Sequence, residues 1–85
     1  MVDWDLIGFI KASQYRLSIL RSLEKRQKTP SELRSELNLY ISHVSKTLKE
    51  LVDRNLVECL TSKLKKGKIF TITEEGRALM AQINK

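Results

Sequence analysis

Apolar residues recur at steps of three and four along most of this chain, and that spacing is typical of one face of an α-helix. The pattern predicts helices over residues 4–12, 14–25 and 41–54, and a shorter helix that begins at Pro30 and ends near Asn38. One proline and three glycines are few breaks for 85 residues. We therefore expect a mainly α-helical fold.

The short helix has well-defined ends. Thr29 can cap its N-terminus, Pro30 suits its first position, and Glu32 completes a capping box. Asn38 tolerates the left-handed turn that ends it. The helix before it ends in a basic turn, residues 25–28, which suits the helix dipole. The next helix begins after only about three residues, so the two helices must cross in a helix-turn-helix.

Two segments with the composition of β-strands follow, at residues 57–61 and 69–73. Gly67 lies between them and supplies the backbone freedom that a hairpin loop needs. A final helix begins with Thr73 as its cap. An added edge strand before Thr29 is compatible with the sequence, but no feature demands it.

The charge distribution suggests a partner. The net charge is +6, which favours an anionic partner such as nucleic acid. Half of the excess falls within residues 57–73, which carry four basic residues and one acidic residue. At the hairpin tip these charges can meet phosphates or a minor groove, the alternative being a tip that only prevents edge pairing. The basic residues are Lys63, Lys65, Lys66 and Lys68.

The helix over residues 41–54 has two distinct faces. Its opposite, polar face carries hydroxyl, imidazole and lysine groups, with no acid in its N-terminal half. Such a half-helix can enter a major groove, the alternative being an ordinary surface helix. The apolar stripe consists of Ile41, Val44, Leu48, Leu51 and Val52. The polar face consists of Ser42, His43, Ser45, Lys46 and Lys49, followed by Glu50 and Asp53.

Little in the sequence indicates catalysis or metal binding. His43 is the only histidine and Cys59 the only cysteine, and a single thiol makes a poor metal partner. There is no glycine-rich phosphate loop and no cluster of metal ligands. We expect no cofactor, no metal and no enzymatic activity. We expect His43 to contact a groove or a phosphate, the alternative being an uninvolved surface residue.

The expected compartment is the cytoplasm. Cys59 cannot form an internal disulfide, which fits a reducing environment. The first residues include Asp3 and Asp5, where a signal peptide would be basic. No apolar segment approaches the roughly 20 residues that span a bilayer.

Both ends of the chain are apolar. These residues either complete the core of the domain or pack against a second subunit. We expect a homodimer. The predicted interface consists of Trp4, Ile7, Phe9, Ile10, Leu79 and Ile83.

The segment over residues 29–58, TPSELRSELNLYISHVSKTLKELVDRNLVE, resembles the winged helix-turn-helix of the MarR and ArsR regulator superfamily, the compact archaeal members in particular. Residues 72–77, ITEEGR, resemble the start of the final helix in that superfamily. The resemblance implies that residues 41–54 form the recognition helix, that the hairpin is the wing, and that homodimers bind pseudo-palindromic DNA.

Two departures from that pattern matter. Tyr40 stands where the family often has a serine or threonine cap, and its hydroxyl can instead meet a phosphate. The ArsR metal site needs paired cysteines on the recognition helix, and this helix has none. We therefore expect no metal sensing of that type.

We interpret residues 1–85 as a single winged helix-turn-helix domain, with a three-helix core, a wing over about residues 62–68 and additional terminal helices. The expected function is a sequence-specific regulator of transcription that binds double-stranded DNA. The alternatives are a winged-helix module that joins proteins in a larger complex, and RNA binding, which usually relies on exposed stacking aromatics. The expected DNA contacts are Thr29, Ser31, Tyr40, Ser42, His43, Ser45, Lys46, Lys49, Lys63, Lys65, Lys66 and Lys68.

Overall fold

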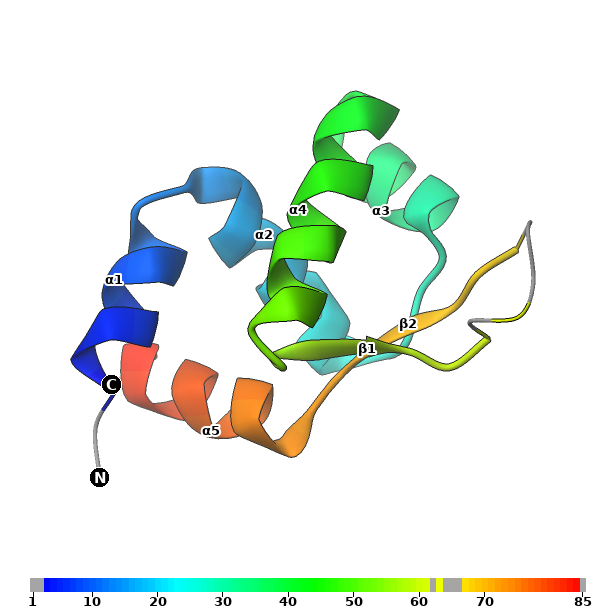
Figure 1. Ribbon diagram of the computed structural model, residues 1–85. Coiled ribbons are helices and arrows are strands. Elements are labelled where there is room, and N and C mark those ends of the chain that lie inside the picture. The colour runs from blue at the N-terminus through cyan, green and yellow to red at the C-terminus, as the bar shows by residue number, and fades with distance from the viewer. Residues whose placement is uncertain (1–2, 62, 64–66, 85) are drawn as a thin grey trace.

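The computed structural model describes residues 3–61, 63 and 67–84. Lys65 and Lys66, two of the predicted wing contacts, lie outside the described residues. Figure 1 shows a helical body from which one hairpin projects, which confirms the predicted fold class. The elements of the described chain are α1 (Trp4–Lys11), α2 (Gln14–Lys25), α3 (Pro30–Leu37), α4 (Ile41–Asp53), β1 (Val57–Cys59), β2 (Phe70–Ile72) and α5 (Glu74–Ile83).

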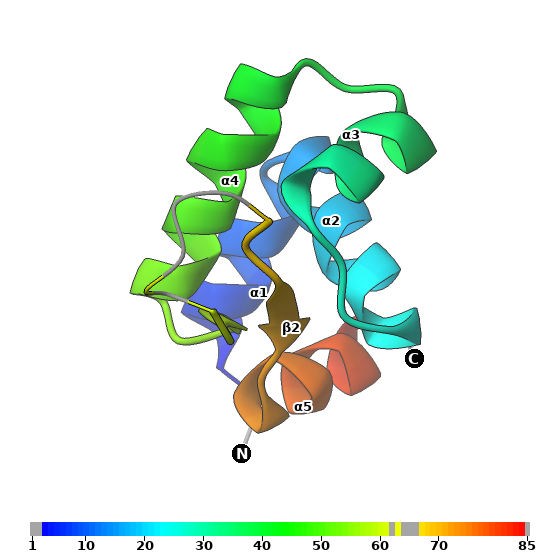
Figure 2. The ribbon, with the colours of Figure 1, turned by 90° about the vertical axis from the view of Figure 1, so that its right-hand side faces the viewer.

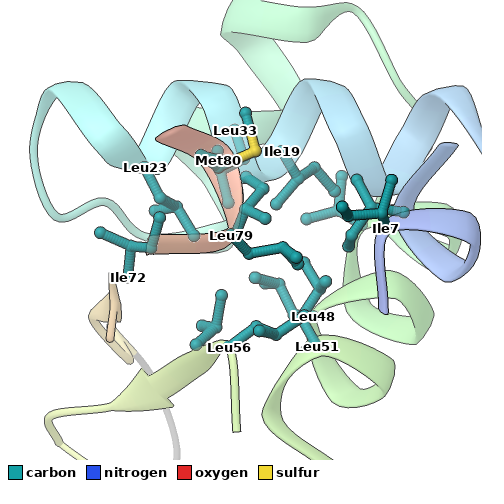
Figure 3. Close-up of a cluster of buried hydrophobic side chains, with 14 residues drawn as sticks. Ile7, Ile19, Leu23, Leu33, Leu48, Leu51, Leu56, Ile72, Leu79 and Met80 are labelled. Carbon is teal, nitrogen blue, oxygen red and sulfur yellow. The ribbon is translucent and has the colours of Figure 1, made fainter. Parts of the chain in front are cut away.

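α2 is the common packing partner in this arrangement. It contacts α1, α3, α4 and α5, as well as β2. Its residues Ile19, Leu20 and Leu23 are fully buried, and Figure 3 shows Ile19 and Leu23 among side chains from the helices around them. Removing apolar surface of this kind from water is the main favourable contribution to folding. The core is therefore built around a single helix.

Three of the six residues expected at a dimer interface lie instead in the core of the single chain. Ile7, Ile10 and Leu79 are buried, and Figure 3 labels two of them within the central cluster. Phe9 and Ile83 are partly buried and pack against the same cluster. A chain of this size needs both terminal helices to complete its small core. Among the six residues, Trp4 is the accessible one, with 75% of its surface exposed.

The predicted helix ends are confirmed by their hydrogen bonds. The Glu32 backbone N–H donates to Thr29 Oγ1 over 3.2 Å, and the Thr29 N–H donates to Glu32 Oε1 over 3.0 Å, which completes the capping box. Asn38 has φ of 55°, so it ends α3 in the left-handed conformation. The Thr73 hydroxyl accepts from the Gly76 N–H over 3.0 Å at the start of α5. Local side-chain chemistry thus sets these three ends.

The two strands are shorter than the predicted segments, residues 57–61 and 69–73. They pair antiparallel, with Cys59 opposite Phe70. Beyond that pair, the Leu60 N–H still donates to the Ile69 carbonyl over 2.8 Å, but the Ile69 N–H donates to the hydroxyl of Thr61. The regular pairing therefore ends with one backbone bond and one side-chain bond.

Lys28 forms the edge contact that the sequence left open. Its N–H donates to the Phe70 carbonyl over 3.0 Å and its carbonyl accepts from the Phe70 N–H over 2.8 Å, so the third strand is reduced to one bridge. The side chain does not belong to an exposed basic turn, because Lys28 is only 3% exposed. Its ammonium group donates to Ser22 Oγ over 2.6 Å and pairs with Glu36. A buried cation needs such a partner.

The start of α5 packs very closely against the hairpin. A Cβ atom on Gly76 would collide with the carbonyl oxygen of Leu56 and lie 2.6 Å from Ile72 Cγ1. We predict that Gly76→Ala lowers the free energy of unfolding by about 1–3 kcal/mol, because α5 must shift outward. Gly8→Ala is the matched control, since no atom lies within 4 Å of its added Cβ. That change should raise stability by about 0.5–1 kcal/mol in urea unfolding. Equal effects would contradict the close approach.

The pair of Lys28 and Glu36 predicts a pH dependence. Hydrogen bonds from Lys28 and Ser22 hold the pKa of Glu36 below its ordinary value of 4.5. The carboxylate therefore contributes stability above the pKa of the unfolded chain, and this is lost as the pH falls through the lower folded pKa. Glu36→Gln should lower the free energy of unfolding by about 1 kcal/mol at neutral pH, and the stability of this variant should fall less steeply as the pH is lowered. Denaturant midpoints from about pH 3 to 7 measure both effects. The control is Glu58→Gln, which changes an exposed carboxylate on β1. If the stability of Glu36→Gln fell with acid as steeply as that of the wild type, the pairing of Glu36 with Lys28 would be refuted.

Candidate nucleic-acid interface

α4 turns one side to the core and the other to solvent. Val44 and Leu51 are completely buried and Leu48 nearly so. The opposite side carries exposed hydroxyl and ammonium groups, and its first two turns contain no acid. The division into faces that the sequence predicted is therefore present in the fold. The exposed residues of this side are Ser42, Ser45, Lys46 and Lys49.

The predicted apolar stripe is wrong along one edge. Ile41 is 48% exposed and Val52 is 37% exposed. α4 meets the rest of the protein along a line that includes Thr47, which is buried although it is polar. The contact is therefore rotated toward Thr47, and the two edge residues face outward beside the lysines.

The first turn of α4 is bordered by aromatic rings. His43 is half-buried, and its ring centroid lies 4.8 Å from that of Tyr15 and 5.8 Å from that of Tyr40. Tyr40 precedes α4 without a side-chain capping bond, as its residue type predicts. Tyr15 was not among the predicted site residues, because only the crossing of α2 and α4 brings it to His43.

Arg16 of α2 pairs with the C-terminal half of α4, and it too was not among the predicted site residues. Its Nε and Nη2 donate to the two carboxylate oxygens of Glu50 over 3.3 and 3.0 Å. Its Nη1 donates to the Phe9 carbonyl over 2.9 Å, and the guanidinium carbons of Arg16 and Arg54 lie 4.0 and 4.3 Å from the centre of the Phe9 ring. This fork geometry is stronger and more directional than a single ion pair.

The acidic residues of α4 are therefore not equivalent. The hydrogen bonds from Arg16 lower the pKa of Glu50 below its ordinary value, so this carboxylate is ionised at neutral pH and already has a cationic partner. Asp53 lies 4.0 Å from the Lys49 ammonium, and both side chains are exposed. Such surface pairs contribute little and exchange readily. Lys49 therefore remains accessible to another anion.

The start of α3, the outward side of α4 and the hairpin come together. Figure 2, turned so that the hairpin points toward the viewer, shows β2 in front, with α4 to its left and α3 to its upper right. A cleft of about 360 Å³ between these elements is lined by Pro30, Ser45, Lys49 and Lys68 together with apolar side chains. The structure thus unites predicted contacts from α4 and the wing.

The remaining predicted contacts differ in accessibility. Ser31 and Lys63 are exposed. Thr29 is half-buried, and its hydroxyl already accepts a bond in the capping box. Lys68 is half-buried beside the cleft.

The described residues were also compared with the requirements of a metal site and of a membrane-spanning helix. Among them, no three side chains of His, Cys, Asp or Glu lie together as a metal site would require. No helix in the described ranges has the length and apolar character to cross a membrane. Cys59 is a free, partly exposed thiol.

Solved structures of similar fold come from several bacteria. A protein assigned to the MarR family of transcriptional regulators from Enterococcus faecalis V583 has a TM-score of 0.82 and 22% identity, over 94% of this chain and 74% of that chain. The reduced transcriptional regulator YodB from Bacillus subtilis has a TM-score of 0.81 and 22% identity, over 99% of this chain and 86% of that chain. Oxidised MarR from Escherichia coli has a TM-score of 0.68 and 22% identity, over 96% of this chain and 71% of that chain. At this identity the likeness shows the fold, and the relatives are regulators rather than enzymes.

Sequence comparison identifies the family. Comparison with curated proteins gives no match. Residues 11–85 match the family model described as winged helix-turn-helix, which spans α2 to α5 and the hairpin. Together with the shared fold, this match shows that the chain belongs to the winged helix-turn-helix family.

Proposed function

We propose that this protein is a transcriptional regulator that binds double-stranded DNA in a sequence-specific manner. α4 enters the major groove, and the wing lies on the backbone or in the minor groove. The observation that carries the proposal is the outward side of α4, where Ser42, Ser45 and Lys46 are exposed on a helix whose other side is fixed in the core. Short hydroxyls and lysines are suited to base edges and phosphates.

Four further features support DNA as the partner. The net charge is +6, and Lys49 and Lys68 line the cleft between α4 and the hairpin. Glu50, the acidic residue of α4 that lies before Asp53, is paired with Arg16. The YodB and E. faecalis proteins that share the fold are described as transcriptional regulators. A basic surface beside a helix-turn-helix is the electrostatic pattern of DNA-binding domains.

A second candidate function is protein docking within a larger complex. Ile41, Val52 and Leu60 are exposed, and a docking module would use apolar residues of this kind. We favour DNA because Ile41 and Val52 flank the lysine-bearing side of α4 and do not interrupt it.

Titration with duplex DNA tests the proposal. If a dimer makes six to ten phosphate contacts, the logarithm of the affinity should fall against the logarithm of the salt concentration with a slope of about −5 to −9. Lys63→Ala with Lys68→Ala should weaken binding to all sequences and make the slope shallower by about two units. Ser42→Ala or Lys46→Ala should instead narrow the gap between a selected site and a scrambled one, by about 1–3 kcal/mol.

The control for these variants is Lys11→Ala, which removes one exposed lysine from α1 at the end of the molecule opposite the hairpin (Figure 1). It should leave both affinity and slope close to wild type. An affinity that stays flat as salt rises would refute DNA binding by this surface. Loss of specificity in the wing variants alone would reverse the roles assigned to the helix and the wing.

The proposed regulator is a homodimer that pairs through its terminal helices. The observation behind this proposal is Trp4, which is largely exposed on α1 although it is the largest apolar side chain. Sedimentation at micromolar concentration should give a mass near twice 9.9 kDa. Trp4→Ala should shift the protein toward the monomer, whereas Tyr40→Ala, which removes another exposed aromatic ring, should not. A wild-type monomer throughout that range would exclude the dimer.

A further inference from the structure

The rings of Tyr15, Tyr40 and His43 form a cluster at the start of α4, here called the ledge. Tyr15, from the first turn of α2, lies against the imidazole with an angle of 30° between the ring planes, and Tyr40 meets it edge-on at 84°. Tyr15 is 39% exposed and Tyr40 is 77% exposed, so the ledge faces solvent. The imidazole of His43 therefore has a ring neighbour from α2 and another from the residue that precedes α4.

A polar hollow of about 220 Å³ lies beside this ledge, between α2 and α4. Its lining includes Ser13, Tyr15, His43 and Lys46, and the Ser13 hydroxyl also accepts from the Arg16 N–H as the cap of α2. The one carboxylate in the lining, Glu50, is held by two hydrogen bonds from Arg16. The hollow therefore presents hydrogen-bond donors and a lysine charge, with its only negative group already paired.

We propose that this hollow receives one phosphate of the DNA backbone, and that Tyr15 is the positioning residue that holds His43 for the contact. This inference rests on the proposed DNA-binding function and adds to it a contact from α2. A phosphate is the group that fits, because its oxygens accept a hydrogen bond from the imidazole and its negative charge suits a site beside a lysine ammonium group. Its place also fits, since the hollow lies on the flank of α4 toward α2, and the flanks of a helix in the major groove face the backbone.

The roles of the two residues differ. His43 is the residue that reaches the phosphate oxygens, whereas Lys46, in the same lining, keeps the role in base discrimination proposed above. Tyr15 acts through the face of its ring, which packs against the imidazole. Replacing the ring should therefore remove the His43 contact, whereas removing only the phenolic hydroxyl should not.

A scan with neutral phosphates tests this directly. A duplex selected from random sequences for binding to the wild-type protein is prepared with one methylphosphonate at a time in place of a phosphate. At one position in each half-site the replacement should weaken wild-type binding by about tenfold, which corresponds to one lost hydrogen bond to a charged group. Tyr15→Ala and His43→Ala should bind the unmodified duplex about tenfold more weakly than the wild type does. For these variants, the methylphosphonate at that position should weaken binding little further. Tyr15→Phe should behave as wild type.

Two controls keep the result interpretable. Arg21→Ala changes another exposed residue of α2, whose side chain points to Asn84 near the end of α5, and it should retain the wild-type sensitivity. Thermal unfolding checks that each variant folds, and Tyr15→Leu replaces Tyr15→Ala if the latter does not. Sensitivity that persists in the Tyr15→Ala or Tyr15→Leu variant would overturn the positioning role, as would a Tyr15→Phe variant as weak as Tyr15→Ala. A wild-type protein that selects no duplex at all would instead refute the proposed function itself.

Discussion

The burial of one side of α4 against α2 is the constraint on which the rest of the structure depends. Each fully buried side chain such as Leu48 or Leu51 contributes about 1.5–3 kcal/mol relative to exposure, and the line continues through Val44 and Thr47. Because α4 is polar on its other side, this packing leaves the serines and lysines no place except the surface. The interface proposed for DNA is thus a consequence of how the core is filled.

Polar contacts then fix the orientation that the apolar packing selects. Arg16 ties Glu50 to α2 and, through Phe9, to α1, while Tyr15 lies against His43 two turns earlier on the same flank of α4. A helix held at both ends presents its outward side in one orientation, which reduces the ordering cost of binding. Specific recognition depends on this kind of pre-organisation.

The hairpin is fixed at its base by two contacts of a different kind. Lys28 pairs with Phe70 through the backbone and with Glu36 through a buried ammonium group, which links the base of the wing to α3. Gly76 allows α5 to approach Leu56 more closely than any side chain would permit. The hairpin base is therefore joined by these contacts to α3 and to α5.

The sequence predicted those features that local chemistry controls. The cap at Thr29, the left-handed Asn38 and the polar side of α4 each depend on residues within a few positions of one another, and each is present. Features that depend on distant partners were not predictable. The burial of Lys28 is one example, because it requires Glu36 and Ser22 to meet across a helix crossing.

The terminal helices show the same limit. Apolar residues such as Ile7, Ile10 and Leu79 fit a core and an interface equally well in sequence, since both remove apolar surface from water. Packing alone decides between the two, and it places these three side chains in the core. Trp4, from the same apolar cluster, remains outside.

Backbone amide chemical shifts of the isotopically labelled protein, recorded as duplex DNA is added, show which elements bind the duplex. The largest changes should fall on Ser42, Ser45, Lys46 and Lys49 of α4 and on the hairpin, with smaller changes at Tyr15. The amides of α5 should change little. Changes concentrated on α1 and α5, with α4 unaffected, would contradict the account.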